Sequence, residues 1–257
     1  MPEKENSFTY HALKRPVIFA HRGSSAHAPE NTLAAFKLAV QQQAAAIELD
    51  VKLTADGQVV VLHDDTVDRT TNGTGRVNSM TLAELKQLDA GSKFDPECQS
   101  ERIPTLAQVL ETVGNQIFIN VEIKNYTSPA DDLSDKVVWL VKDYGLETSV
   151  MLSSFNMIAL IRARALMPEI PLGLITIKGM AGITLRSKLV RFGPLLVFHP
   201  HYLDVSPQLI QATHQAGARI HTYTVNQPDI MRQLFTTGVD GIFTDDPVLA
   251  QKVLIEI

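Results

Sequence analysis

Short apolar runs of strand length alternate with longer amphipathic segments of helix length through most of this chain. Strands that alternate with helices in this way form a parallel sheet with right-handed crossovers. Nine runs are predicted to be strands: residues 16–20, 46–51, 58–63, 116–124, 149–154, 172–177, 195–198, 219–225 and 241–244. A strand count near eight in 257 residues favours an α/β fold of the closed (β/α)₈ type, the TIM barrel, in a single domain covering residues 1–257.

The third run cannot be one of the barrel strands. Only residues 52–58 lie between Val51 and Val59, whereas a parallel crossover needs about a dozen residues or more. The intervening Asp56-Gly57 is typical of a hairpin turn. Residues 59–63 are therefore predicted to pair antiparallel with residues 46–51, outside the barrel, and to return His63 to the neighbourhood of Glu48 and Leu49.

The segments between the strands predict the helices and one insertion. Helices are expected at residues 33–42, 82–88, 104–113, 129–144, 156–167, 207–216 and 228–236. Asn31 or Thr32 could cap the first helix, and Gly217 and Gly238 follow the last two, as glycine often does. Residues 65–102 are irregular and rich in turn formers, which indicates a small insertion after the hairpin.

Charge and composition argue against several classes of protein. A net charge of -5 and a pI of about 5.9 argue against a nucleic-acid binder, which needs a basic face. The single Cys98 cannot form an internal disulfide. No run approaches the ~18 apolar residues of a transmembrane helix, and residues 1–10 lack the apolar core of a signal peptide. We therefore expect a cytoplasmic protein without a stable membrane anchor, and self-association into a homo-oligomer stays open.

Two carboxylates, Glu48 and Asp50, occupy alternate positions of the second predicted strand and so share one of its faces. Glu122 and Lys124 repeat this spacing in the fourth run. Burial of neighbouring carboxylates is unfavourable unless a cation or hydrogen-bond donors lie between them, so the pattern indicates a metal site, with a solvated strand face as the alternative. Three carboxylates suit one hard divalent cation, Mg²⁺ or Ca²⁺, with Mn²⁺ also possible.

Polar side chains gather where the predicted strands end, which is where barrels of this type place their active sites. They are His21, Arg22, Glu48, Asp50, Glu122, Lys124, Ser154, His199, His201, Tyr223, Asn226 and Asp245. Arginine and lysine beside a divalent ion suit a phosphate ester, because they spread its negative charge over three cations. Two histidines on opposite sides of the cation could then deprotonate a nucleophile and protonate a leaving alkoxide.

Eight motifs resemble, in the same order, those of glycerophosphodiester phosphodiesterases. They are His21-Arg22-Gly23, Pro29-Glu30-Asn31-Thr32, Glu48-Leu49-Asp50-Val51, His63-Asp64, Glu122-Ile123-Lys124, Ser154-Phe155, Thr224-Val225-Asn226 and the run of residues 238–245. Together they extend from residue 18 to about residue 249. The resemblance implies a (β/α)₈ barrel with a small insertion, in agreement with the strand count.

The resemblance also implies a role for individual residues. The acid–base pair would be His21 and His63, the metal ligands Glu48, Asp50 and Glu122, and the phosphate-binding cations Arg22 and Lys124. Phe155 and Tyr223 are expected to contact the substrate, and Glu30 and Asn31 to support the first loop. Apart from the resemblance, His199 and His201 flank Pro200 after the run of residues 195–198, so one or both are expected to line the pocket, with His201 as a substrate contact. Many relatives have tryptophan where this chain has Tyr223, a difference that bears on the substrate's alcohol.

The expected function is metal-dependent hydrolysis of a small glycerophosphodiester to sn-glycerol 3-phosphate and an alcohol such as choline, ethanolamine or glycerol. The alternatives are a lysophospholipase D or phosphatidylinositol-type phospholipase on the same barrel, or a phosphoester-binding protein without catalysis. The attacking group is either a neighbouring hydroxyl of the substrate, through a cyclic phosphate, or water. The preferred alcohol and the role of Arg186, Lys188 and Arg191 stay open.

Overall fold

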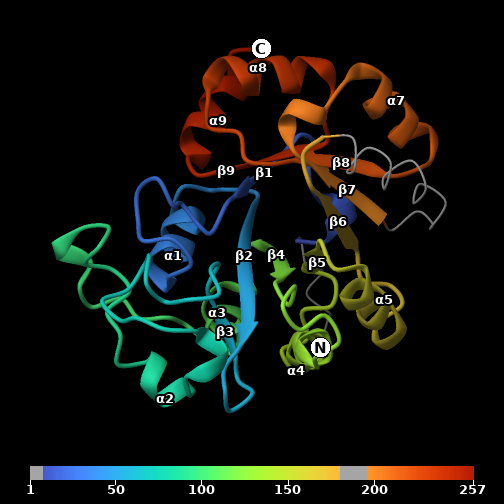
Figure 1. Cartoon of the computed structure of the whole chain (residues 1–257). Coiled ribbons are helices and arrows are strands. Elements are labelled where there is room, and N and C mark those ends of the chain that lie inside the picture. The colour runs from blue at the N-terminus through green and yellow to red at the C-terminus, as the bar shows by residue number, and fades with distance from the viewer. Residues whose placement is uncertain (1–7, 180–195) are drawn as a thin grey trace, which may run out of the picture.

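A closed ring of parallel strands forms the centre of the computed structural model, which describes residues 8–179 and 196–257 (Figure 1). Within these residues the ring consists of β1 (Val17–Ala20), β2 (Ala46–Leu53), β4 (Phe118–Ile123), β5 (Val150–Ser154), β6 (Leu172–Thr176), β7 (Leu196–Pro200), β8 (Arg219–Thr222) and β9 (Gly241–Thr244). The ring closes because β1 pairs in parallel with both β2 and β9. The predicted (β/α)₈ barrel is confirmed.

A ninth strand among the described residues, β3 (Val59–Val61), is bonded to β2 outside the ring, as predicted. It runs antiparallel to β2, with Val51 opposite Val61. The expected pairing with residues 46–51 is confirmed at its end, where Val51 pairs with Val61 and the Leu62 N–H donates to the Asp50 carbonyl at 3.0 Å. The rest of the pairing lies beyond that range, because β2 continues to Leu53 before the chain turns. Gly57 lies in this turn at a φ of 73°, a conformation that glycine adopts without steric cost.

Helices surround the ring (Figure 1). They are α1 (Leu33–Gln41), α3 (Leu106–Val113), α4 (Leu133–Asp143), α5 (Met157–Leu166), α7 (Pro207–Gln215), α8 (Pro228–Thr237) and α9 (Pro247–Ile255). Thr32 caps α1 by accepting a hydrogen bond from the Ala35 N–H at 3.3 Å, whereas Asn31 turns inward. α4 begins later than predicted, and α9 was not predicted at all. The basic cluster Arg186, Lys188 and Arg191 lies outside the described residues.

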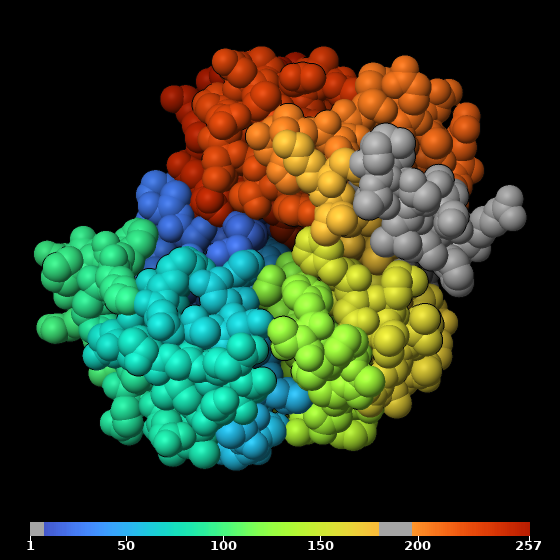
Figure 2. All heavy atoms as spheres, viewed as in Figure 1, coloured from blue at the N-terminus to red at the C-terminus, as the bar shows by residue number. Residues whose placement is uncertain are grey.

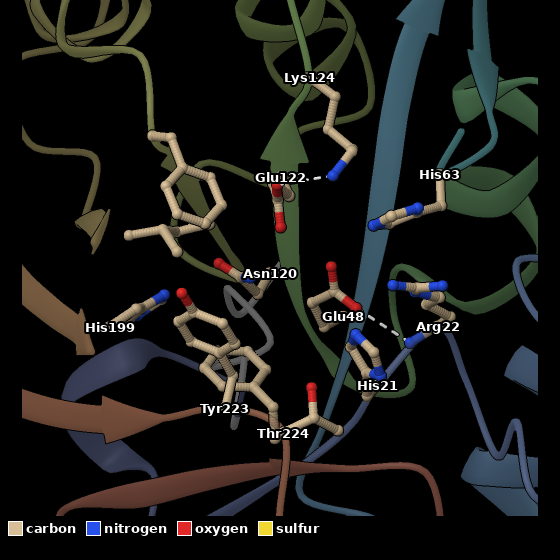
Figure 3. A pocket seen from close by; sticks show the side chains of 13 residues that line it. His21, Arg22, Glu48, His63, Asn120, Glu122, Lys124, His199, Tyr223 and Thr224 are labelled. Carbon is tan, nitrogen blue, oxygen red and sulfur yellow. Dashed lines mark hydrogen bonds and ion pairs between the residues drawn. The ribbon is translucent and has the colours of Figure 1, made fainter. Parts of the chain in front are cut away.

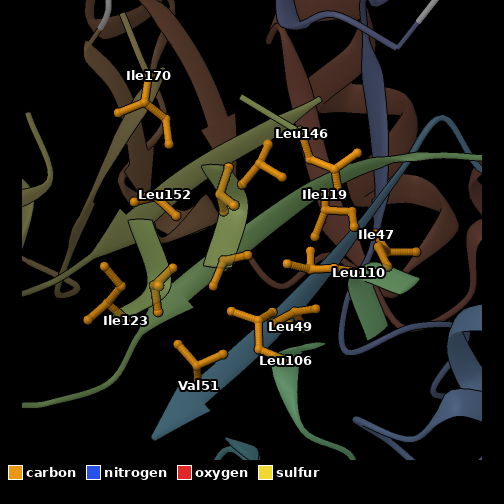
Figure 4. Close-up of a cluster of buried hydrophobic side chains, with 14 of the residues drawn as sticks. Ile47, Leu49, Val51, Leu106, Leu110, Ile119, Ile123, Leu146, Leu152 and Ile170 are labelled. Atoms are coloured by element: carbon orange, nitrogen blue, oxygen red, sulfur yellow. The ribbon is translucent and has the colours of Figure 1, made fainter. Parts of the chain in front are cut away.

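The alternation of side chains along the strands separates the core from the site. On β2, Ile47, Leu49 and Val51 face the helices and join a large apolar cluster with residues of α3 and β4 (Figure 4). Ala46, on the other face of β2, belongs to a second cluster inside the barrel. Its other members include Phe19, Phe118, Met151, Val197 and Phe243. Glu48 and Asp50 share this inner face, since every second residue of a strand points the same way. The strand period thus directs both carboxylates into the barrel.

The region after the hairpin, residues 65–102, forms a lobe at one side of the molecule, coloured cyan to green in Figure 2. It contains α2 (Leu82–Leu85) and the short 3₁₀ helices η2 (Val77–Ser79) and η3 (Pro96–Cys98). Val67, Val77 and Leu85 pack against Val60 and Leu62 of the hairpin in a small apolar cluster. The boundaries of the insertion and of a single domain over residues 1–257 stay predictions.

The described helices are short for a membrane span. The longest helix of the described residues, α4, has 11 residues, whereas crossing a bilayer takes about 20. Within the described ranges no helix is long and apolar enough to cross a membrane.

Candidate functional site

A cavity of about 220 Å³ opens where the parallel strands end, as expected for this fold. Eight of the predicted site residues line it: His21, Arg22, Glu48, His63, Glu122, Lys124, Phe155 and Tyr223 (Figure 3). Asp50 is not among the lining residues and is only 1% exposed. It contacts two residues that do line the cavity, Arg22 and Lys124. His201 is not among the residues that line the cavity, so its contact with a substrate stays a prediction.

The three predicted metal ligands lie together. Glu48, Asp50 and Glu122 each offer a carboxylate oxygen, and these oxygens lie within 4.8 Å of one another. Oε1 of Glu48 and Oδ1 of Asp50 are buried and accept no hydrogen bond. Burial and the charges of Asp50 and Glu122 raise the pKa of Glu48 well above its ordinary value. Hard anionic oxygens held in this way suit a divalent cation, which would relieve the repulsion between them.

Hydrogen bonds from neighbouring residues fix the orientation of each of these three carboxylates. Glu48 accepts a hydrogen bond from the backbone N–H of Arg22 at 2.9 Å, where Arg22 has a φ of 58°. Asp50 accepts one from the Asn31 side chain at 2.9 Å. Glu122 accepts from the Tyr126 hydroxyl at 2.5 Å. The tight turns at Arg22 and Asn31, both at positive φ, therefore serve the site directly.

Two partly buried cations border the carboxylates. The Lys124 ammonium lies 3.2 Å from Glu122 and 3.6 Å from Asp50, and the Arg22 guanidinium lies 3.4 Å from Asp50. Burial alone would lower the pKa of Lys124, but Glu122 and Asp50 outweigh it and raise that pKa. For Asp50, burial would raise the pKa, and Lys124, Arg22 and His63 bring it to about 2. Asp50 is therefore ionised and both cations are charged at neutral pH.

Each of the two histidines is paired with an aspartate. Nδ1 of His21 lies 2.6 Å from Asp245, which also accepts from Asn226 at 2.6 Å. Nδ1 of His63 lies 2.6 Å from Asp64. Because an ionised carboxylate can only accept, each Nδ1 carries the proton and each Nε2 is left to exchange one. In the view of Figure 3 the two rings lie on either side of the contact between Arg22 and Glu48.

The environment of His63 adjusts its basicity. Burial lowers the pKa of His63, Asp50 opposes this, and the positive charges of Lys124 and Arg22 lower the pKa further. The net decrease favours the neutral ring, the form that can accept a proton at neutral pH. For Asp245, burial would raise the pKa, but the contacts with His21 and Asn226 lower it, so this carboxylate stays ionised.

The opposite wall of the cavity is uncharged and largely aromatic. The Phe155 ring lies edge-on to the Tyr223 ring with centroids 6.3 Å apart, and to the Tyr126 ring at 5.6 Å. The Tyr223 hydroxyl donates to the carbonyl of Thr176 at 2.8 Å, which fixes its ring. Ile175 and Phe243 complete this wall. The cavity thus has one charged side and one apolar side (Figure 3).

The structure also adds residues that the sequence did not assign to the site. Asn120 and Thr224 line the cavity, and no function was predicted for Asp64 or Tyr126. His199, one of the polar residues expected at the strand ends, also lines the cavity. The strand period could have indicated Asn120, because it precedes Glu122 on the same face of β4. Tyr126 lies beyond the end of β4, where no periodicity guides its placement.

The family comparison agrees with this geometry. Residues 21–249 match the model of the glycerophosphoryl diester phosphodiesterase family. The chain is 40% identical over 237 residues to a glycerophosphodiester phosphodiesterase of Caldanaerobacter subterraneus subsp. tengcongensis, a match covering 91% of this chain and 95% of that protein. It is 37% identical over 244 residues to a glycerophosphodiester phosphodiesterase of Bacillus altitudinis, covering 93% and 98%.

Solved structures show the same barrel. A phosphodiesterase of Oleispira antarctica, determined in complex with the product sn-glycerol-3-phosphate, has a TM-score of 0.86 and 35% identity, and the match covers 94% of this chain and 97% of that one. A glycerophosphodiester phosphodiesterase of Agrobacterium tumefaciens has a TM-score of 0.77 and 33% identity, covering 92% and 99%. The match over most of the chain and the identity of these relatives show that the chain belongs to the glycerophosphoryl diester phosphodiesterase family.

Proposed function

We propose that this enzyme hydrolyses glycerophosphodiesters to sn-glycerol 3-phosphate and an alcohol. The observation that carries the proposal is the joint position of the Glu48, Asp50 and Glu122 carboxylates, two cationic side chains and two histidine–aspartate pairs around one cavity. The named activity of the relatives and the product held by the Oleispira antarctica enzyme support the same substrate class.

The charged side of the cavity binds the phosphodiester. Glu48, Asp50 and Glu122 would hold one divalent cation, with Mg²⁺ or Ca²⁺ as the expected ion and Mn²⁺ as a third option. When bound, such an ion withdraws charge from phosphoryl oxygens and acidifies a nearby hydroxyl. Arg22 and Lys124 border these carboxylates and supply two further positive charges for the phosphoryl oxygens, which become more negative as the nucleophile attacks.

The two histidines move the protons. One Nε2 accepts the proton of the attacking hydroxyl, while the other imidazole, protonated beforehand, donates its proton to the departing alcohol. Asp245 and Asp64 keep the two rings oriented and stabilise the charged imidazolium. If the substrate's own neighbouring hydroxyl attacks, a cyclic phosphate forms and water then opens it with the two roles exchanged. If water attacks directly, a single displacement gives the same products.

The aromatic side of the cavity receives the alcohol. Phe155 and Tyr223 present ring surfaces, and aromatic faces attract cationic groups such as quaternary ammonium. We therefore expect choline or ethanolamine esters to be accepted. A lysophospholipid would also need space for an acyl chain, so a comparison of glycerophosphocholine with lysophosphatidylcholine separates the two substrate classes.

The decisive assay measures sn-glycerol 3-phosphate released from glycerophosphocholine. Turnover should disappear after chelation and return on addition of Mg²⁺, Ca²⁺ or Mn²⁺. Glu122→Gln should lose most of the activity, whereas Glu111→Gln, which alters an exposed carboxylate of α3, should retain it. Full turnover by metal-free enzyme, or no release of glycerol phosphate under any of these conditions, would contradict the proposal.

Three further expectations accompany the function. A small phosphodiester is the only partner that the site requires, and the acidic chain is not expected to bind nucleic acid or to carry a stable membrane anchor. A cytoplasmic location stays a prediction that cell fractionation can test. Self-association into a homo-oligomer is a possibility that light scattering on the purified protein would decide.

A further inference from the structure

An arginine of the region after the hairpin, Arg69, contacts the carboxylate partners of two residues that line the cavity, His63 and Arg22. The Arg69 guanidinium donates from Nε to Asp64 at 2.6 Å, and from its two terminal nitrogens to Glu30 at 2.6 and 2.8 Å. Asp64 is the partner of His63, and Glu30 accepts a hydrogen bond from Arg22 at 2.8 Å. Arg69 therefore connects, through one carboxylate on each side, a proton-transfer residue with a phosphate-binding one.

Only a guanidinium can make this connection. Its planar fork presents several N–H donors in fixed directions, so it can bond two carboxylates at once, whereas a lysine ammonium acts as a point charge on a flexible stem. Burial would raise the pKa of Asp64, but the hydrogen bonds from Arg69 and His63 lower it. Asp64 is thus an ionised acceptor whose position is fixed from both sides.

The fixed position of Asp64 determines the state of His63. An ionised Asp64 that stays 2.6 Å from Nδ1 requires the proton of the neutral ring to be on Nδ1, which leaves Nε2 available toward the cavity. Without Arg69, Asp64 would be anchored by His63 alone and could rotate toward solvent, because its side chain is 31% exposed. The ring could then change its tautomer and its orientation.

We propose that Arg69 is a positioning residue, which holds Asp64 and Glu30 so that His63 and Arg22 face the phosphodiester in fixed geometry. The proposal rests on the function proposed above. It assigns a catalytic purpose to the region after the hairpin, whose apolar residues pack against Val60 and Leu62 of the hairpin. A purely structural Arg69 would instead affect the stability of the fold and leave the properties of His63 unchanged.

The kinetic test compares Arg69→Met and Arg69→Lys with the wild-type enzyme on glycerophosphocholine. Both variants should lower kcat by about 10- to 100-fold, because Lys cannot restore the two-sided contact, and KM should change far less. Arg76→Met is the matched control, since Arg76 belongs to the same region but lies 4.0 Å from Asp65 and outside this network. The control should behave as wild type.

A double-mutant cycle adds a sharper criterion. If Arg69 acts partly through Asp64, the variant Asp64→Asn combined with Arg69→Met should keep a higher kcat than the product of the two single losses predicts, because both changes remove the contact between Arg69 and Asp64. Multiplicative losses in kcat, or a kcat for Arg69→Met within about threefold of wild type, would overturn the proposal.

A spectroscopic measurement separates this proposal from the function itself. In ¹⁵N-labelled enzyme with Mg²⁺, the ring nitrogens of His63 should show the Nδ1-protonated tautomer, and Arg69→Met should shift the ring toward the Nε2-protonated form. An unchanged tautomer in Arg69→Met would refute the positioning role. If wild-type enzyme fails to hydrolyse any glycerophosphodiester, the proposed function is wrong, while the tautomer still decides the role of Arg69.

Discussion

Two neutral histidines are buried inside the barrel, and they should make the fold sensitive to acid. The rings of His199 and His221 stack with centroids 5.3 Å apart and are 1% and 0% exposed. Burial lowers the pKa of His199 to about 3. Burial, with the charges of His199 and Arg219, also lowers the pKa of His221 well below its ordinary value. Both rings stay neutral in the folded enzyme at pH values where the unfolded chain binds protons.

The magnitude follows from the linkage between protonation and folding. Histidine in the unfolded chain titrates near pH ~6.5, so below that pH the unfolded state binds protons that the folded state cannot. This contribution to stability is complete above about pH 6.5 and is lost as the pH falls toward the folded pKa. Between about pH 7.5 and about pH 5, His199 alone should remove about 2 kcal/mol from the free energy of unfolding, and His221 should add a loss of the same sign.

Chemical denaturation over this pH range tests the reasoning. His221→Gln removes one of the two proton-binding sites, so the difference in free energy of unfolding between wild type and variant should shift in favour of the variant as the pH falls below about 6.5. The difference itself cancels the carboxylates that both proteins share. His11→Gln, at an exposed histidine, is the control and should leave the pH dependence unchanged. A constant difference between wild type and His221→Gln would refute the argument.

Four further predictions concern the site. Removal of the cation should lower the melting temperature, because Glu48, Asp50 and Glu122 then repel one another. An ion added at about 100 times its Kd should restore about 2.7 kcal/mol of the free energy of unfolding. An unchanged melting curve would exclude a bound ion. Glu122→Gln should weaken Mg²⁺ binding measured by calorimetry, whereas unaltered affinity would remove this residue from the ligand set. His21→Ala and His63→Ala should each lower kcat by about 10²- to 10⁴-fold. If the cyclic route operates, a substrate that lacks the neighbouring hydroxyl should bind but turn over very slowly. Normal hydrolysis of that analogue would establish attack by water.

The sequence predicted the fold well because the barrel is encoded by local patterns. Each strand of the ring is a short apolar run, and the spacing of seven residues between two runs excluded a crossover and identified the hairpin. The register of the hairpin was missed, since nothing local shows that β2 extends to Leu53. α9 was missed because apolar residues lie on both of its sides: Val248 is 44% exposed and Ile255 85%, beside buried Ala250 and Val253. Its Asp246 cap before Pro247 was the available signal.

The site was predictable where it depends on the strand period and not where it depends on loops. Glu48 and Asp50 share a face by periodicity alone, the strand end and the hairpin placed His21 and His63 nearby, and the family resemblance assigned them the acid–base role. The contact between Arg69 and Glu30 joins residues 39 positions apart, both outside strands, so only the folded chain brings them together. His199 ended a predicted strand together with His201, and the pattern could not distinguish which of them faces the cavity.

The division of the cavity into a charged and an uncharged side has an evolutionary consequence. Both histidines, Arg22 and two of the carboxylates precede residue 70, whereas Phe155 and Tyr223 come from the loops after β5 and β8. In a barrel, each of these loops can be exchanged without altering the neighbouring strand pairs. Relatives could therefore diversify in the alcohol they release by grafting new loops onto one half of the barrel, while the other half keeps its proton-transfer residues in place.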